Sequence, residues 1–298
     1  MDERYIHTKA GLTIFTESIG KINKPPIVLV MGAMNQGIFW YDSFCQKLSD
    51  NGFYVIRFDH RDTGLSSMVD YKKSPYDLND LTDDVIAILD FYNINKAHIL
   101  GLSMGGYIGQ LLGVNYPKRI ETLTLISTTA DHRPYMDATM GNFNNKYILP
   151  YPKKIFLDYI EKGKAEPPKN ESDIYNFQIE GWRIMFGNIN TEDFKAITHL
   201  IELANNRSNN RYSAYNHGLA VSNSKERINI VKNIVAPTLI IHGENDPCLP
   251  LEHGKFLNEL IPNSKFEIIK DMGHMFSLTE SKYLSDIIIK NIIDLQFA

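Results

Sequence analysis

Short apolar runs alternate with amphipathic stretches along the first 130 residues of the chain. The runs PPIVLVMG, YVIRFDH, KAHILGLS and IETLTLIST are almost entirely apolar, as expected of strands buried on both faces of a sheet. Between them, FWYDSFCQKLSDNG, residues 78–92 and YIGQLLGVNY have helical spacing. The opening segment, YIHTKAGLTIFTESIG, alternates around Lys-Ala-Gly and predicts a β-hairpin. This alternation of strand and helix predicts a mostly parallel, doubly wound α/β sheet.

The alternation stops near residue 130 and resumes about a hundred residues later, which is long for a simple connection. In the interval PYPKKIFLDYIEKG, IYNFQIEGWRIMFG and TEDFKAITHLIELANN predict helices, while KAEPPKNES and NNRSNNRYS predict polar loops. The pattern returns with APTLIIHGENDP, LEHGKFLNELI, SKFEIIKDMGH and KYLSDIIIKNIIDL. We therefore expect an α/β core formed by residues 1–130 and 233–298, and a helical cap inserted at residues 131–232.

Composition and charge exclude several classes of protein. The chain has 298 residues, 43% of them hydrophobic, which is ample for a large core. Its net charge of −4, with no block of Lys or Arg, argues against a nucleic-acid partner. The start MDERYIHTKAG lacks the features of a signal peptide, and no apolar run is long enough for a bilayer. We expect a cytoplasmic protein without membrane contact. The two cysteines, Cys45 and Cys248, form no metal-binding pattern, and nothing favours a disulfide between them.

The stretch GLSMGG places Ser103 between Gly101 and Gly105, after an apolar run and before a helical one. A G-x-S-x-G turn between a strand and a helix is typical of a nucleophile elbow, in which the sharp bend lifts the serine hydroxyl clear of the sheet. A serine in an ordinary turn could show the same sequence pattern. Because the hydroxyl becomes a good nucleophile only beside a base, the interpretation depends on its partners.

Two such partners follow later apolar runs. Asp246 comes after TLIIH and His274 after FEIIK, so both lie just beyond the carboxyl end of a predicted strand. The order Ser, Asp, His is the chain order of the catalytic triad in enzymes that carry their serine on such an elbow. Glu244, two residues earlier, and Asp131, which follows the run IETLTLIST, are alternative acids. Asp246 is preferred because it follows TLIIH, the strand end at which a triad in this order places its acid.

The remaining requirement is an oxyanion hole made of backbone N–H groups. One donor is expected from Met104, directly after the nucleophile, and the other from Ala33, which follows Gly32 in the loop after PIVLVMG. Neither H-x-E nor H-E-x-x-H spacing occurs, and GLSMGG lacks the Lys-Ser/Thr end of a phosphate loop, so we expect no metal and no cofactor.

A third polar group follows the run YVIRFDH. We interpret Asp59, Arg61 and Asp62 as a structural network that braces the loop beside the oxyanion hole, because a planar guanidinium suits a carboxylate.

These motifs resemble those of α/β-hydrolase fold enzymes over nearly the whole chain. VMGAMNQG, FDHRDTGLSS and GLSMGG together resemble the aclacinomycin methylesterase branch of the serine esterases. Most relatives have D-x-R-G-x-G-x-S where Asp62 here replaces the first glycine, as in that branch, and the usual His-Gly of the oxyanion loop is Met31-Gly32. The resemblance implies an α/β-hydrolase fold with a cap. It also implies that Ser103, Asp246 and His274 act as nucleophile, acid and base, and that Ala33 and Met104 supply the oxyanion donors.

The resemblance and the aromatic-rich insertion together imply a bulky, partly apolar small-molecule ester as substrate. Polyketide methyl esters and macrolactones such as macrolides are both candidates for a carboxylic ester hydrolase (serine esterase or lactonase). The expected substrate contacts are Met34, Trp182, His217 and Met275. Serine at the elbow argues against haloalkane dehalogenases and most epoxide hydrolases, which need aspartate there. Carbon–carbon bond hydrolases, perhydrolases, small-lactone hydrolases and a non-catalytic small-ligand receptor stay open as alternatives.

Overall fold

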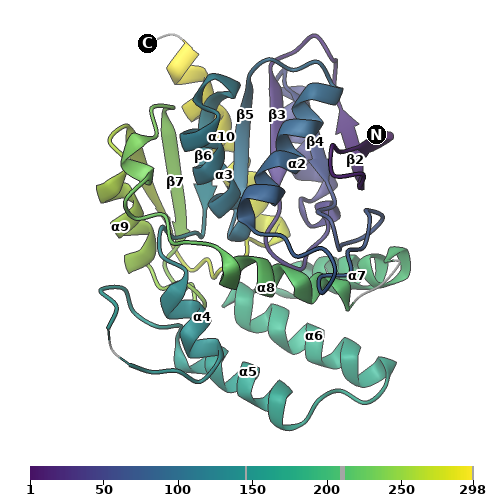
Figure 1. Ribbon diagram of the computed structural model, residues 1–298, viewed down its shortest axis with the longest axis vertical. Coiled ribbons are helices and arrows are strands. Elements are labelled where there is room, and N and C mark those ends of the chain that lie inside the picture. Colours follow the sequence, from purple (N-terminus) through teal and green to yellow (C-terminus); the bar gives the residue numbers. More distant parts are fainter. Residues whose placement is uncertain (145, 209–211, 297–298) are drawn as a thin grey trace.

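The computed structural model describes residues 1–144, 146–208 and 212–296. Their strands form one sheet in the order β1-β2-β4-β3-β5-β6-β7-β8 (Figure 1). The strands are β1 (Asp2–His7), β2 (Thr13–Ile19), β3 (Pro26–Val30), β4 (Tyr54–Phe58), β5 (Ala97–Leu102), β6 (Ile120–Ile126), β7 (Thr238–Gly243) and β8 (Ser264–Ile269). β1 and β2 form the predicted antiparallel hairpin, and β2 pairs antiparallel with β4. The pairings from β4 through β3, β5, β6 and β7 to β8 are parallel, which confirms the mostly parallel sheet.

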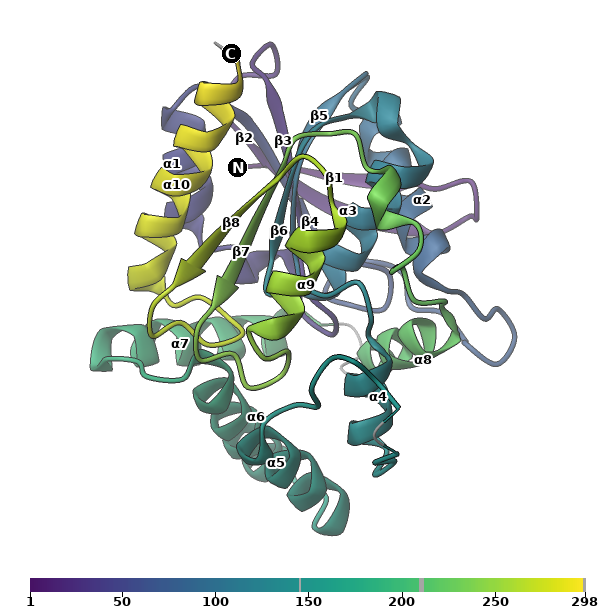
Figure 2. The ribbon, with the colours of Figure 1, turned by 90° about the vertical axis from the view of Figure 1, so that its left-hand side faces the viewer.

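Helices cover both faces of this sheet, as the doubly wound pattern predicts. α1 (Asp42–Asp50) and α10 (Leu278–Gln296) lie on one face, and α2 (Leu78–Phe91), α3 (Met104–Asn115) and α9 (Glu252–Leu260) lie on the other (Figure 2). Each face has its own apolar core: Val85 and Ile108 belong to one, Phe44 and Leu284 to the other. The central strands β3–β7 lie between these cores and are buried on both sides, which explains their nearly continuous apolar runs.

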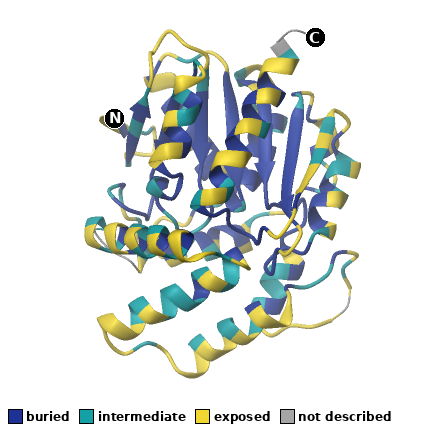
Figure 3. Ribbon diagram, turned by 180° about the vertical axis from the view of Figure 1, so that it is seen from behind, coloured by how far each residue is buried: buried dark blue, intermediate teal, exposed yellow. Residues whose placement is uncertain are grey.

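A separate group of helices lies beyond the carboxyl ends of the parallel strands, in the segment between β6 and β7 (Figure 1). It comprises α4 (Arg133–Thr139), α5 (Lys154–Ala165), α6 (Glu171–Phe186), α7 (Thr191–Arg207) and α8 (Asn216–Asn223). Their outward faces are exposed, whereas the central strands β3–β7 are almost entirely buried (Figure 3). The sequence pattern predicted α5, α6 and α7 but not α4 and α8, which have only 7 and 8 residues. Part of the predicted loop NNRSNNRYS, residues 209–211, lies outside the described residues.

This segment leaves and rejoins the sheet at one place. β6 and β7 are neighbouring strands, and the Arg227 N–H donates to the Ala130 carbonyl at 2.8 Å. The Arg227 guanidinium, which is also buried, donates to the Thr129 carbonyl at 3.0 Å. The stretch of chain that follows β6 is therefore hydrogen-bonded to the stretch that leads back to β7. None of the described helices combines the length and apolarity needed to span a bilayer.

Several histidines are buried in the fold, and burial disfavours their charged form. Burial lowers the pKa of His60 and of His132 to about 3, and the pKa of His98 and of His253 to about 4. In the unfolded chain these groups titrate near their ordinary pKa of about 6.5. The unfolded state therefore binds more protons than the folded state once the pH falls below about 6.5.

We expect the free energy of unfolding to fall steeply between pH 7 and pH 5. The stabilisation is fully present above the unfolded pKa and is lost as the pH falls toward the folded pKa values, by about 2 kcal/mol for each such histidine at pH 5. Urea unfolding at pH 7, 6 and 5 measures this slope. His98→Leu removes one of the titrating groups, so the slope should decrease in that variant. A free energy that stays constant from pH 7 to pH 5 would contradict the prediction.

Candidate active site

The GLSMGG turn connects β5 to α3 and holds Ser103 in an unusual backbone conformation. Ser103 has φ 54° and ψ −115°, in the half of conformational space that non-glycine residues rarely adopt. The turn packs so tightly that a Cβ atom on Gly105 would lie 2.0 Å from the Val30 carbonyl oxygen, and one on Gly101 would lie 2.3 Å from that of Gly105. Both glycines are therefore required sterically, and the geometry is that of a nucleophile elbow.

Replacing Gly105 with alanine should destabilise the protein by about 3 kcal/mol or more, since the new methyl group meets backbone rather than a movable side chain. Thermal unfolding of the purified variant measures the loss. Gly218→Ala is the matched control, because a Cβ atom there has nothing within 4 Å. As Gly218 lies within α8, that variant should be as stable as the parent or slightly more so. Equal stability of the two variants would refute the steric argument.

The structure brings the three predicted triad residues into one hydrogen-bonded chain. His274 Nε2 lies 3.0 Å from Ser103 Oγ, and His274 Nδ1 lies 2.8 Å from Asp246 Oδ2. Asp246 follows β7 and His274 follows β8, so all three residues stand at the carboxyl edge of the sheet. The loop that carries His274 is anchored to α6, because the His274 N–H donates to the Met185 carbonyl at 2.7 Å.

Asp246 is fully buried, and its surroundings favour the ionised form. Burial by itself would raise the pKa of this carboxyl, but His274 and His242 beside it hold the pKa well below its ordinary value. The carboxylate also accepts the N–H groups of Cys248 and Leu249 at 2.8 and 2.9 Å. An ionised Asp246 accepts the Nδ1–H of His274. That leaves the lone pair on His274 Nε2 to accept a proton from the Ser103 hydroxyl.

The two alternative acids lie elsewhere. Asp131 is paired with Arg133, whose Nε and Nη2 donate to its carboxylate at 2.7 and 2.8 Å. Glu244 is exposed to solvent. Of the three candidates, Asp246 is the carboxylate that bonds to His274.

The loop with the predicted oxyanion donor lies directly against the nucleophile. A Cβ atom on Gly32 would be 3.4 Å from Ser103 Cβ. The loop turns back on itself through a 3.4 Å bond from the Asn35 N–H to the Gly32 carbonyl, and Met34 has φ 66°. Met104 is the first residue of α3, where a backbone N–H has no partner within the helix. Within the described ranges, the Ala33 N–H and the Met104 N–H donate to no protein oxygen.

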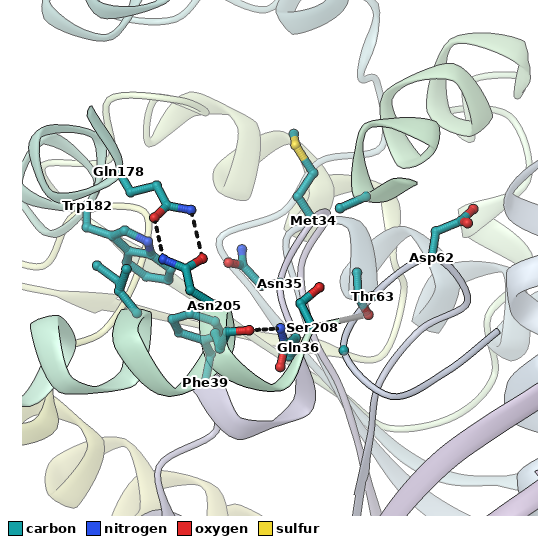
Figure 4. Close-up of a pocket in the computed structure, with 14 residues that line it drawn as sticks. Met34, Asn35, Gln36, Phe39, Asp62, Thr63, Gln178, Trp182, Asn205 and Ser208 are labelled. Atoms are coloured by element: carbon teal, nitrogen blue, oxygen red, sulfur yellow. Dashed lines mark hydrogen bonds between the residues drawn. The ribbon is translucent and has the colours of Figure 1, made fainter. Parts of the chain in front are cut away.

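An open cleft begins beside this loop at Met34 and is lined by residues of α6 and α7 (Figure 4). Neither Ser103 nor His274 belongs to its lining. Of the four predicted substrate contacts, Met34 and Trp182 line it. Trp182 stacks on Phe39 with ring centroids 4.7 Å apart, beside a reciprocal amide pair formed by Gln178 and Asn205. The full lining is Met34, Asn35, Gln36, Phe39, Asp62, Thr63, Gly64, Gln178, Trp182, Ile201, Ala204, Asn205, Ser208 and Ala214.

The other two predicted contacts do not belong to this lining. Met275 is buried next to His274, with only 3% of its surface exposed, and its contact with substrate stays a prediction. His217 has no exposed surface, and both of its ring nitrogens are occupied by backbone groups, the Met34 N–H and the Arg61 carbonyl. This geometry leaves His217 no free nitrogen for a substrate.

The polar group after β4 forms a more extended network than the sequence indicated. Arg61 pairs with Asp84 of α2 at 2.7 and 2.8 Å, not with its sequence neighbours. Asp59 accepts the Gly37 N–H at 2.8 Å and forms an ion pair with Arg207 of α7 at 3.1 Å. Their partners Asp84 and Arg207 are distant in sequence, and no local pattern marks them.

One group of described residues has the composition of a metal site. Asp246, Cys248 and His274 place potential ligand atoms within 4.8 Å of one another. Asp246 Oδ2 and His274 Nδ1 are already hydrogen-bonded to each other, so a cation held by these two atoms would have to displace the Nδ1 proton. Both cysteines are buried free thiols, and burial raises the pKa of each, which keeps them protonated and poor as ligands.

Comparison with known proteins gives concordant results. The profile of the α/β hydrolase fold family matches residues 25–281. Rhodomycin D methylesterase DauP from Streptomyces sp. (strain C5) is 30% identical over 274 residues, covering 91% of this chain and 92% of the relative. The methylesterase DnrP from Streptomyces peucetius is 29% identical over the same length, with the same coverage. These relatives confirm the resemblance to the methylesterase branch.

The solved esterase EaEST from Exiguobacterium antarcticum superposes with a TM-score of 0.76 at 22% identity, covering 98% of this chain and 99% of that one. The chain therefore belongs to the α/β-hydrolase fold family.

Proposed function

We propose that this protein is a serine hydrolase that cleaves a carboxylic ester. The observation that carries the proposal is the chain of hydrogen bonds from Ser103 Oγ through His274 to the buried Asp246, at 3.0 and 2.8 Å. Such a chain supplies what a serine hydroxyl needs in order to attack a carbonyl: a base within reach, and an acid that fixes the tautomer of that base.

In the proposed reaction Ser103 Oγ attacks the ester carbonyl while His274 Nε2 takes the hydroxyl proton. The carbonyl oxygen gains the electron pair and is stabilised by the N–H groups of Ala33 and Met104. The C–O bond to the leaving group then breaks, and His274 gives its proton to the departing alkoxide, which leaves as an alcohol. A water molecule, deprotonated by His274, attacks the acyl-enzyme, and the acid product and the free Ser103 hydroxyl are released.

A methyl ester of a bulky, partly aromatic molecule is the substrate class that we favour. Two observations support it. Two relatives that are 29 and 30% identical over nine-tenths of the chain are named methylesterases. In addition, Trp182 and Phe39 offer a stacked aromatic wall in the cleft beside the oxyanion loop. We assign residues 131–232 as the cap that covers this cleft, since Gln178, Trp182 and Asn205 of that segment line it. A macrolactone is the second candidate, because hydrolysis of a ring ester requires the same chemistry.

The proposal is tested by the mass of the products. Wild-type protein is incubated with p-nitrophenyl esters of increasing chain length, with methyl esters of polycyclic aromatic acids, and with macrolides. A methyl ester should lose one CH2 unit as methanol leaves, whereas a lactone should gain one water. If only p-nitrophenyl esters are cleaved, the mechanism holds and the preference for a bulky substrate is wrong. If a ligand binds but none of the panel is cleaved, the receptor alternative replaces the hydrolase.

A further inference from the structure

His217 of α8 contacts the oxyanion loop from within the segment between β6 and β7. Its Nδ1 atom lies 2.9 Å from the Met34 backbone nitrogen, and its Nε2 atom lies 2.8 Å from the Arg61 carbonyl oxygen. Because the Met34 N–H can only donate, Nδ1 must carry the lone pair. Nε2 therefore carries the proton and donates to Arg61. These two backbone partners fix both the tautomer and the orientation of the ring.

The bond from Met34 restrains a backbone that is strained. Met34 has φ 66°, a left-handed conformation that is uncommon for a non-glycine residue and persists where the surroundings hold it. The preceding residue, Ala33, carries the proposed oxyanion donor, and Gly32 before it lies against Ser103. A change in the Met34 backbone would therefore turn the adjacent peptide groups of the donor loop.

A second histidine holds the start of the same loop. His60 Nε2 lies 2.9 Å from the Met31 carbonyl oxygen, and the His60 and His217 rings pack edge to face with centroids 5.6 Å apart. His60 belongs to the core, whereas His217 comes from α8. The loop Met31–Met34 is therefore held at one end by the core and at the other by the inserted segment.

We propose that His217 is a positioning residue: by accepting the Met34 N–H it holds the oxyanion loop in the conformation that directs the Ala33 N–H toward the reacting carbonyl. The inference rests on the proposed function. It gives the inserted segment a part in transition-state stabilisation in addition to its contribution to the cleft. His217 touches no reacting atom, so its effect is exerted through the Met34 backbone.

The surroundings of His217 keep it in the state that this role requires. Burial lowers the pKa of His217 and outweighs the hydrogen bond to the Arg61 carbonyl, which raises it. Two charged groups lie near the ring: the Asp62 carboxylate raises its pKa and the Arg61 guanidinium lowers it. The neighbouring His60 is itself held neutral, because burial lowers its pKa to about 3. Protonation of Nδ1 would place two donors opposite each other and break the bond to Met34.

Two near-isosteric variants separate the two hydrogen bonds of His217. In His217→Asn the side-chain oxygen occupies the place of Nδ1 and can still accept the Met34 N–H, while the bond to Arg61 is lost. In His217→Gln the terminal amide reaches the place of Nε2, so the bond to Arg61 is kept and the acceptor for Met34 is lost. Both variants remove the imidazole from the same buried position, so a general loss of packing affects them alike.

The readouts are kcat and KM for p-nitrophenyl butyrate, and the inhibition constant of butaneboronic acid, which forms a tetrahedral adduct with an active serine. His217→Gln should lower kcat by about 10²-fold and change KM by less than about threefold, because an oxyanion donor acts mainly in the transition state. Binding of the boronic acid should weaken in parallel with kcat. His217→Asn should keep kcat within about fivefold of wild type.

Asn216→Ala is the matched control from the same helix. Asn216 Nδ2 donates to the Asp62 carboxylate and to the Val69 carbonyl, both at 3.0 Å, so its removal weakens the docking of α8 without touching the Met34 bond. This variant should keep kcat within about threefold of wild type.

Equal kcat values for His217→Asn and His217→Gln, or a loss in Asn216→Ala as large as that in His217→Gln, would overturn the inference. Full activity of Ser103→Ala would instead overturn the proposed function, so the two failures are distinguishable.

Discussion

Replacing Ser103 with alanine should lower kcat for a cleaved ester by about 10⁶-fold, to the residual rate that binding and the oxyanion donors provide. The alanine removes the oxygen atom that forms the acyl-enzyme, and no neighbouring hydroxyl bonds to His274 Nε2 among the described residues. The rate is measured from release of p-nitrophenol in the steady state and from the initial burst. The burst should be absent in the variant.

The control for this experiment is Ser127→Ala. Ser127 follows the neighbouring strand β6, is fully buried and, like Ser103, has a positive φ, 45°. Its hydroxyl has no hydrogen-bond partner in the described structure. We expect this variant to retain kcat within about threefold of wild type, since its hydroxyl belongs to no catalytic group.

Ser103→Ala should also keep its affinity for the acid product. An unchanged rate in Ser103→Ala would exclude the proposed mechanism.

Replacing Asp246 with asparagine should lower kcat by about 10⁴-fold. An asparagine amide in this position would donate to His274 Nδ1, and the imidazole proton would then lie on Nε2. That nitrogen could no longer accept the proton of the Ser103 hydroxyl. Since asparagine is close to aspartate in size, the fold should persist, and circular dichroism and thermal unfolding can verify that it does.

Asp131→Asn distinguishes the assigned acid from its alternative. Asp131 is buried and paired with the half-exposed Arg133, and asparagine keeps its size and one acceptor oxygen. We expect its kcat to be close to that of wild type. If Asp131→Asn were inactive and Asp246→Asn were active, the acid would have to be reassigned.

The parts of the site that could be predicted from the sequence are those fixed by local pattern and strand topology. Gly101 and Gly105 mark the elbow because the turn has no space for a Cβ atom. Asp246 and His274 could be placed with Ser103 because each follows a buried apolar run, and the carboxyl ends of parallel strands meet at one edge. Neither inference required knowledge of contacts between distant segments.

The contacts that could not be predicted join side chains far apart in the chain. Arg61 pairs with Asp84 across 23 positions, and His217 reaches Met34 across 183. No periodicity or motif records which polar groups will face each other after packing. The short helices α4 and α8 were also missed, because 7 or 8 residues give too few turns for an amphipathic pattern to stand out.

The bond between Arg227 and Ala130 has a consequence for protein engineering. Because the outgoing and returning chains meet there within 2.8 Å, the segment between them is a cassette whose two junctions are already adjacent. A chimera that exchanges this cassette for that of a related esterase would leave the strand order of the host unchanged. If His217 acts as we propose, the donor cassette must also bring an acceptor for the Met34 N–H. Chimeras that fold but lack this acceptor should have a low kcat.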